Sequence, residues 1–478
     1  MSRSIWKGKV TFDDVLLEPR YSAGISSRQE IDVQTHLTRN ITTKIPLVSS
    51  PMDTVTETNM AILMARLGGA GIVHRYNTID IQVAMIQKIK RSHNFVILQP
   101  FCVPPDTTLI DLKKRMNASG IRSYLVTDSS RHLIGIITER DVRFAPSGAT
   151  VSDVMTTDVK KITTSNINDL SELNYKAMFH THRVKKLPIV NHANEVMGLV
   201  TAKDMATIIE WPNISLTKDN TLLCGAAIGI QETTERLDHL VNVGVDFICV
   251  DTANGDQERV YELVKKIKRD YPAIDIITGN IATHDGYLRC KQSGADAVRV
   301  GIGSGSSCTT RLVSGVGYPQ LSSLLDIYTV HNASIESDSI PMISDGGSRH
   351  LSGNMVKALM GGAASVMLGS TLAGTDESPG TVLIKNNKRV KIFRGMAGYG
   401  SNLDRSKDIN AFVPEGIESI VEYKGSAKEI IQKLVGGIKS GLSYCGGHDI
   451  KSARNNAYFI EQSMSSKTES GVHDVSEI

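Results

Sequence analysis

The sequence predicts an α/β fold: a TIM (β/α)8 barrel interrupted by an inserted domain with an internal repeat. Alternating strand and helix patterns begin in residues 1–95 and return in residues 213–478. Each predicted strand of the later part leads into a polar residue or a glycine, as expected where barrel strands end at an active site. A repeat fills residues 96–212 between the two parts. An open doubly wound sheet is the alternative, because alternation alone does not count strands.

Residues 1–95 contain the first strand–helix–strand unit of the predicted barrel. An apolar run at 45–50 predicts a strand, and residues 56–67 predict a helix that ends at Gly68-Gly69. A second short apolar run follows at 71–73. The order strand, helix, strand is that of a parallel α/β unit.

Residues 213–478 continue this alternation and contain most of the predicted strands. Apolar runs predict strands at 247–250, 274–278, 297–300, 342–344 and 365–368. The residues at or just after their ends are Asp251, Asn280, Gly301, Asp345 and Gly369. Since the carboxyl ends of parallel strands lie at one end of a barrel, we expect these five positions to surround one site.

The repeat in residues 96–212 has two copies, offset by 63 residues. Both copies carry Gly, Thr and Asp at spacing 0, 3 and 6: Gly135, Thr138 and Asp141 in the first, and Gly198, Thr201 and Asp204 in the second. Two units rarely form an open array, so we expect the copies to pack against each other. A purely structural insert is the simpler alternative.

Composition and charge exclude several classes of protein. With 53 basic and 50 acidic residues the net charge is +3, which gives no electrostatic reason to expect dedicated nucleic-acid binding. No apolar run is long enough for a signal peptide or a membrane span. The 6 cysteines are scattered without a CxxC pair, which disfavours disulfides and a zinc site. The expected location is the reducing cytoplasm, with no membrane contact.

The densest chemical signal is the segment from Gly301 to Arg311, GIGSGSSCTTR. Its three glycines allow the backbone to approach a bound group closely and to turn its amides inward. A cysteine at the end of such a loop is exposed, and nearby amide dipoles favour its thiolate. Cys308 is therefore the candidate nucleophile, with a buried structural cysteine as the alternative.

Two more glycine clusters follow, Ser344-Asp345-Gly346-Gly347 and Met367-Leu368-Gly369-Ser370. Backbone amides of such loops late in a barrel bind phosphate oxygens. The Asp345 carboxylate is suited to accept hydrogen bonds from a ribose diol. Around one cysteine, the three clusters predict a nucleoside monophosphate held beside a thiolate.

Over nearly its whole length the chain resembles the superfamily of inosine monophosphate (IMP) dehydrogenase and guanosine monophosphate (GMP) reductase. Besides the Cys308 loop, the matching runs are TFDDVLL from Thr11, SSPMDTV from Ser49, GVGYPQ from Gly315, Asp345-Gly346-Gly347, and YKG from Tyr423. The resemblance implies a TIM barrel in 1–95 and 213–478, the latter with a flap and a C-terminal tail. It also implies a homotetramer or octamer.

The repeat resembles a tandem pair of CBS motifs, a Bateman module, which the superfamily carries at this place. Such pairs bind purine nucleotides between the copies and regulate the enzyme. The positions that match ribose-contacting residues of the CBS family are Thr138, Asp141, Thr201 and Asp204.

The resemblance implies one shared chemistry with two outcomes. A cysteine thiolate attacks C2 of the purine, and hydride passes between C2 and a nicotinamide. The reductase converts GMP to IMP with NADPH through a thioimidate intermediate, releases ammonia, and uses a Thr–Glu pair for the proton. The dehydrogenase oxidises IMP to xanthosine monophosphate with NAD and needs water activated by an arginine on a mobile flap.

We interpret the sequence as a reductase. The flap between Gly395 and Gly416 is short, and the dehydrogenase Arg-Tyr dyad is absent because Ser406 follows Arg405. Residues that match the reductase Thr–Glu pair are Thr310 and Glu415, although the dehydrogenase often carries similar residues there.

Two alternatives remain open. The runs at 49–52 and 377–380 are dehydrogenase-like, and a displaced Arg405 could still activate water, so IMP dehydrogenase is the second reading. A nucleotide sensor with an inactive barrel is the third, although the intact Cys308 loop disfavours it.

The resemblance also assigns binding residues. Substrate positions are Ser50, Met52, Asn280, Arg299, Ser306, Asp345, Gly346, Gly347, Gly369, Ser370 and Met396. Cofactor positions are Asp251, Thr252, Ala253, Gly301 and Gly303. A monovalent cation such as potassium is implied at the carbonyls of Gly303, Gly305 and Cys308.

Two departures from the family pattern fall near the predicted phosphate site. Phe393 stands where the family usually has tyrosine, so a hydroxyl is lost there. The stretch 348–353 is one residue longer than usual. The resemblance therefore does not fix the geometry of the phosphate loop.

Overall fold

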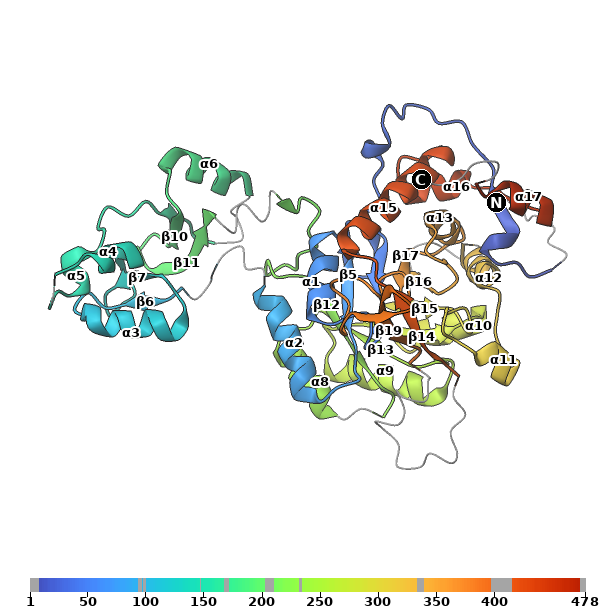
Figure 1. The fold of residues 1–478 in the computed structure, drawn as a ribbon, viewed down its shortest axis with the longest axis horizontal. Helices are drawn as coiled ribbons and strands as arrows, with labels where there is room; N and C mark the ends of the chain where they lie inside the picture. Colours follow the sequence, from blue (N-terminus) through green and yellow to red (C-terminus); the bar gives the residue numbers. More distant parts are fainter. Residues whose placement is uncertain are drawn as a thin grey trace. The chain divides into compact units, whose positions relative to one another are not determined.

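The computed structural model describes residues 8–92, 97, 100–146, 148–166, 172–202, 210–231, 234–332, 339–396 and 415–472 (Figure 1). The chain divides into two compact units. One comprises Met1–Ser92, Asn213–Thr217 and Leu222–Ile478, and the other His93–Pro212 and Lys218–Thr221. Within the described ranges, no helix has the length and apolar character needed to cross a membrane.

The larger unit is built on a closed barrel of eight parallel strands, whose order is β12-β13-β14-β15-β16-β17-β4-β5. The strands are β4 (Leu47–Ser49), β5 (Ala70–Val73), β12 (Cys224–Ile228), β13 (Phe247–Val250), β14 (Asp275–Ile281), β15 (Ala297–Val300), β16 (Met342–Asp345) and β17 (Ser365–Leu368). The predicted TIM barrel is confirmed, because β12 pairs with both β13 and β5 and so closes the ring. An open doubly wound sheet is thereby excluded.

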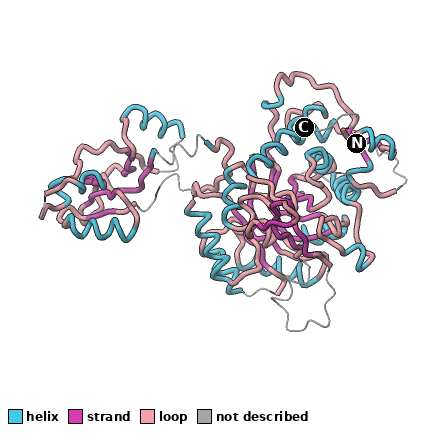
Figure 2. The backbone as a smooth tube through the Cα atoms, viewed as in Figure 1, coloured by secondary structure: helices cyan, strands magenta, loops and turns pink. Residues whose placement is uncertain are grey.

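Helices surround this ring of strands, as Figure 2 shows for the larger unit. They are α1 (Thr58–Arg66), α2 (Ile79–Arg91), α8 (Thr234–Asn242), α9 (Glu258–Asp270), α10 (His284–Gln292), α12 (Gln320–Asn332) and α13 (Ser352–Met360). Helix α9 illustrates why they pack there, since Val260, Val264 and Ile267 recur at helical spacing and are buried. The barrel interior is filled by apolar side chains that include Val48, Phe247 and Ile343.

Segments from both ends of the chain lie together outside the barrel (Figure 1). Strand β1 (Val15–Leu17) pairs antiparallel with β21 (Phe459–Glu461). The other elements of these segments are η1 (Phe12–Asp14), η2 (Arg28–Glu30), β2 (Thr35–His36), β3 (Thr42–Thr43), α15 (Ala427–Tyr444), α16 (Ile450–Asn456) and α17 (Met464–Glu469).

Two further pieces complete the larger unit next to the strand ends. The short helix α11 (Thr310–Ser314) follows the Cys308 loop. An antiparallel sheet is formed by β18 (Leu383–Lys385), β19 (Lys388–Arg394) and β20 (Glu418–Glu422). Most of the predicted flap, residues 397–414, lies outside the described residues.

The smaller unit contains two three-stranded sheets, β6-β7-β8 and β11-β10-β9. Its first half has β6 (Cys102–Val103), α3 (Leu109–Ser119), β7 (Ser123–Thr127), β8 (Leu133–Thr138), α4 (Glu139–Arg143) and α5 (Val151–Val154). Its second half has β9 (Ile162–Thr163), α6 (Glu172–His182), β10 (Lys186–Val190) and β11 (Val196–Thr201). The halves therefore repeat a strand, a helix and an antiparallel strand pair.

The two halves pack against each other through equivalent residues. The Leu133 amide donates to the Asn194 carbonyl at 2.9 Å, and the Val196 amide donates to the Arg131 carbonyl at 3.0 Å. Arg131 and Asn194 both adopt left-handed backbone conformations, with φ of 65° and 66°. Since both pairs obey the 63-residue offset of the sequence repeat, the halves are related by an approximate twofold axis.

Candidate active site

Cys308 lies in the loop between β15 and α11 and begins a chain of hydrogen bonds. Its Sγ lies 3.1 Å from the Thr310 hydroxyl, which donates to Glu415 Oε2 at 2.7 Å. Residues 415–417 run antiparallel to the cysteine loop, since the Thr309 amide donates to the Glu415 carbonyl at 2.9 Å. This pairing places a carboxylate two hydrogen bonds from a half-buried thiol.

The other cysteines lack this combination of access and polar partners. All six thiols are free, and those of Cys224, Cys249, Cys290 and Cys445 are buried. Burial raises the pKa of Cys224 and Cys290 to about 12 and that of Cys249 and Cys445 to about 11, so these four stay protonated near neutral pH. Burial also raises the pKa of Cys102, which lies in the smaller unit.

Glycines bring the cysteine loop against the loop that follows β16. A Cβ atom on Gly301, where φ is 148°, would lie 2.2 Å from the Asp345 carbonyl. The Gly347 amide donates to the Ser304 carbonyl at 3.1 Å, and the Ser304 hydroxyl donates to the Asp345 carbonyl at 2.9 Å. Two of the three predicted glycine clusters are therefore in direct contact.

The Asp345 carboxylate is held from one side, through a single oxygen. Asn280 Nδ2 and Arg299 Nη2 each donate to Oδ2 at 2.8 Å. Oδ1 makes no hydrogen bond within the described part of the chain. That oxygen is therefore the one suited to accept hydrogen bonds from a ligand hydroxyl.

Asp251 at the end of β13 joins the same network. Arg299 Nη1 lies 3.4 Å from Oδ1 and Arg75 Nε lies 3.1 Å from Oδ2, while the Tyr76 hydroxyl donates to Oδ2 at 3.2 Å. Burial alone would raise the pKa of Asp251, but the two guanidiniums hold it below its ordinary value. Charges therefore alternate along Arg75, Asp251, Arg299 and Asp345 across the strand ends.

The loops after β4 and β17 close the other side of the site. Ser50 is buried and donates its amide to the Leu368 carbonyl at 3.0 Å. A Cβ atom on Gly369 would lie 3.3 Å from Met52 Sδ, which shows how close these loops are. Lys424 Nζ holds the loop after β17 by donating to the Ser370 carbonyl at 2.6 Å.

The remaining predicted residues differ in what surrounds them. Ser306 and Ala253 are exposed, and Thr252 is half-buried with its hydroxyl bonded to the Asn254 carbonyl at 3.0 Å. Met396 is half-buried and ends a described range. The flap residues Asp404, Arg405 and Ser406 lie outside the described residues.

The positions predicted to contact a nucleotide in the smaller unit have a local role as well. The backbone amide and the hydroxyl of Thr138 donate to Asp141 Oδ2 at 2.8 and 2.7 Å and so cap α4. Thr201 ends β11 at the equivalent place. Asp204 lies outside the described residues.

Arg75 and Tyr76 join the candidate site through Asp251, although they are not among the residues predicted from the sequence. They follow strand β5 by two and three positions. Polar residues just after a strand are the signal that points to them, as it does for Asp251 and Asp345. Their partner Asp251 is 176 residues away from Arg75 in the chain, so local patterns gave no further signal.

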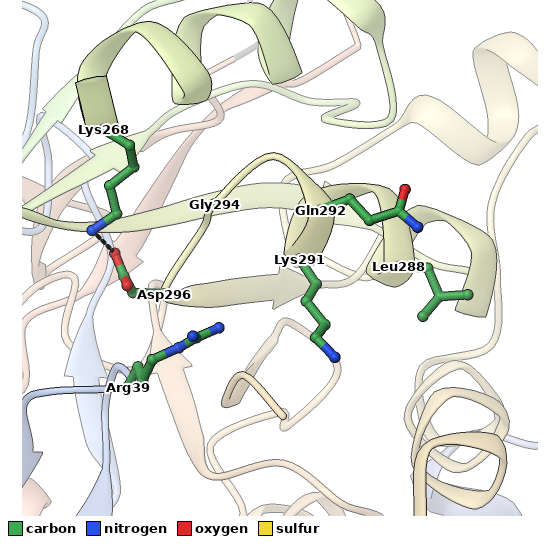
Figure 3. A pocket seen from close by; sticks show the side chains of 7 residues that line it. All are labelled: Arg39, Lys268, Leu288, Lys291, Gln292, Gly294 and Asp296. Atoms are coloured by element: carbon green, nitrogen blue, oxygen red, sulfur yellow. Dashed lines mark ion pairs between the residues drawn. The ribbon is translucent and has the colours of Figure 1, made fainter. Parts of the chain in front are cut away.

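A separate hollow of about 630 Å³ opens at the opposite end of the barrel, around the residues that precede β15 (Figure 3). It is lined by Arg39, Lys268, Leu288, Lys291, Gln292, Gly294 and Asp296. The Lys268 ammonium is neutralised there by Asp296 at 2.6 Å. None of the predicted site residues lines this hollow.

Comparison with known proteins agrees with this geometry. The IMP dehydrogenase / GMP reductase domain matches residues 9–473. Inosine-5'-monophosphate dehydrogenase of Nitrosopumilus maritimus is 45% identical to this chain, and the match covers 98% of this chain and 99% of the dehydrogenase. GMP reductase of Leishmania major is 40% identical, and the match covers 98% of this chain and 97% of that reductase. A crystal structure of a cysteine-to-alanine variant of Trypanosoma brucei GMP reductase with guanosine 5'-monophosphate aligns with TM-score 0.84, at 38% identity, over 99% of both chains. The chain belongs to the IMP dehydrogenase / GMP reductase family.

Proposed function

We propose that this protein is a GMP reductase, which converts GMP to IMP and ammonia with NADPH. The observation that carries the proposal is the hydrogen-bond chain from the Cys308 thiol through Thr310 to Glu415. A thiol that can pass its proton to a carboxylate through one hydroxyl is equipped both to attack and to return that proton to a leaving group.

In the proposed reaction the sulfur of Cys308 bonds to C2 of the guanine. The thiol proton moves through Thr310 to Glu415. When the bond between C2 and the exocyclic nitrogen breaks, the same relay returns the proton, so the amino group leaves as ammonia and a thioimidate remains. A reduced nicotinamide dinucleotide supplies the hydride that replaces the C2–S bond and frees the thiolate.

The end of β13 is accessible to the nicotinamide of such a dinucleotide, since Ala253 is exposed and Thr252 is half-buried. Asn280 and Arg299 are left to the substrate side, because both donate to Asp345 at 2.8 Å. Asp251, Thr252 and Ala253 would hold the adjoining ribose, with Gly301 and Gly303 leaving room for the ring.

A potassium ion is compatible with the same loop. The carbonyls of Gly303, Gly305 and Cys308 would be its ligands, since hard monovalent cations take carbonyl oxygens. The Gly305 carbonyl accepts the Cys308 amide at 3.1 Å and keeps a second lone pair. We propose the ion as a support for the loop.

IMP dehydrogenase is the second candidate, favoured by the 45% identity to the dehydrogenase of Nitrosopumilus maritimus. That reaction needs an activated water, and the Arg-Tyr dyad that supplies it in the family is replaced by Arg405-Ser406 in this sequence. The reductase needs only groups that the described site contains. An inactive nucleotide sensor is disfavoured by the intact relay from Cys308 to Glu415.

Two absorbance assays decide between these functions. With GMP and NADPH we expect the absorbance of the reduced cofactor to fall and IMP and ammonia to appear in equal amounts. With IMP and NAD we expect no rise of absorbance. A signal only in the second assay would overturn the reductase in favour of the dehydrogenase, and silence in both would favour the sensor.

We also propose that the smaller unit is a tandem CBS pair that regulates the enzyme. Its approximate twofold symmetry places Thr138 and Thr201 at equivalent strand ends, where nucleotides would bind with Asp141 and Asp204. The proposed assembly is a homotetramer, which nucleotides convert to an octamer or back.

Addition of ATP, GTP or GMP is expected to change the rate at subsaturating substrate at least about twofold, because a coupling of 1–3 kcal/mol is typical between linked sites. Asp141→Asn keeps an acceptor for the α4 cap but removes the charge, and is expected to weaken the response. Kinetics measured beside sedimentation velocity test this. Unchanged rates and unchanged sedimentation with all three nucleotides would contradict it.

A further inference from the structure

The loop between β16 and α13 contains an unusual backbone at the proposed phosphate site. Gly346 and Gly347 have φ of 96° and 79°, and Arg349 and His350 follow with φ of 49° and 63°. Two consecutive left-handed residues with side chains are uncommon, and such conformations gather at ligand sites. Arg349 and His350 belong to the stretch 348–353, which by the resemblance is one residue longer than usual.

His350 connects the two loops that would share the phosphate. Its Nδ1 lies 2.9 Å from the hydroxyl of Thr371, which is buried. Thr371 directly follows Gly369 and Ser370, whereas Gly346 and Gly347 belong to the loop of His350 itself. The imidazole therefore spans the two glycine loops.

The second nitrogen of the ring remains available. Nε2 of His350 makes no hydrogen bond to the described residues. The charged groups around the ring are Lys424, which lies after β20, and Arg349, which lies on the same loop and is paired with Asp13 of η1 at 2.6 Å. An anion placed between the loops would thus meet a free ring nitrogen, whereas the charge of Arg349 is already neutralised by Asp13.

We propose that His350 is a substrate-binding residue that contacts the nucleotide phosphate through Nε2. The proposal rests on the proposed function in one respect, namely that the substrate is a nucleoside monophosphate. It applies equally to GMP and IMP.

The effect of pH on binding follows from the charge of the ring. Burial and then Lys424 lower the pKa of His350 in the free protein, so the ring is neutral near pH 7. A phosphate dianion favours the protonated ring and raises its pKa. Binding therefore takes up a proton, and GMP affinity is expected to fall as pH rises through the histidine range.

Two substitutions of His350 distinguish a direct contact with the phosphate from mere support of the loop. In His350→Gln the side-chain amide reaches the place of Nε2, whereas in His350→Asn it reaches the place of Nδ1, and asparagine tolerates the left-handed conformation. We expect Asn to weaken GMP binding about tenfold and Gln to weaken it about twofold, as for loss of a charge-assisted hydrogen bond. Guanosine, which lacks the phosphate, is expected to bind all three proteins equally.

Calorimetry on the full chain without dinucleotide measures these affinities, with Arg349→Asn as the matched control in the same loop. Loss of the pH dependence in the Asn variant, with the control unchanged, supports the proposal. Equal losses for Asn, Gln and the Arg349 control, or for GMP and guanosine, would overturn it in favour of loop support. If the unmodified protein binds guanosine as tightly as GMP, the proposal that the substrate is a nucleoside monophosphate fails. That result is distinct from a failure of the role proposed for His350.

Discussion

Replacing Cys308 with alanine is expected to reduce turnover at least about a thousandfold, because a covalent nucleophile has no substitute in the site. GMP affinity is expected to stay within a few-fold, since the phosphate and ribose contacts lie on other loops. Steady-state kinetics and calorimetry on the same preparation measure both quantities. Iodoacetamide should inactivate the unmodified protein, and saturating GMP should protect it.

Cys102→Ala is the matched control for this variant. Cys102 is the other thiol that is not fully buried, and it lies in the smaller unit. We expect its activity and its alkylation-dependent loss of activity to match those of the unmodified protein. Substantial turnover in Cys308→Ala would refute a covalent mechanism, and loss of GMP binding in that variant would show that the change damaged the site rather than the chemistry.

Strong apolar runs made most of the barrel predictable from the sequence. The predicted strands at 247–250, 297–300 and 365–368 coincide with β13, β15 and β17. Strand β12 was missed because its residues, CGAAI, are mostly small and carry little of the β-branched signal that identifies strands. Strand β14 extends to Ile281, beyond the predicted end at residue 278. The prediction stopped early because Gly279 and Asn280 are residue types typical of turns.

Some contacts of the candidate site could likewise be predicted from the sequence, and others could not. The contact between the Cys308 loop and Asp345 follows from strand order, since β15 and β16 are neighbours and glycines permit the approach. The Thr310–Glu415 hydrogen bond joins residues 105 positions apart in the chain. It depends on a short antiparallel contact between Cys308 and Gly416, which the pattern of apolar residues in the sequence does not predict. Only the resemblance to a known family identified that pair. The bridge from His350 to Thr371 required the structure, because the left-handed residues that produce it carry no sequence signature.

Removing the charge at the end of the relay gives the second large effect. Glu415→Gln keeps the shape of the side chain and an acceptor for Thr310 but cannot take up the proton. We expect kcat to fall about a hundredfold to a thousandfold, the range for loss of a general acid–base group, while the GMP affinity stays nearly unchanged. Rapid-quench measurement of ammonia release should show that the slowed step is cleavage of the C2–N bond.

Thr310 provides the control that distinguishes a relay from a simple support. Thr310→Ser retains the hydroxyl and is expected to keep most activity, whereas Thr310→Val removes it and should resemble Glu415→Gln. Because the two residues act on one proton, the Val and Gln changes combined should cost little more than either alone. Losses that multiply in the double variant would mean that Thr310 and Glu415 act independently. Full activity in Glu415→Gln would show that a group other than Glu415 carries the proton. The hydrogen-bond chain from Cys308 to Glu415 would then no longer support the proposed reductase.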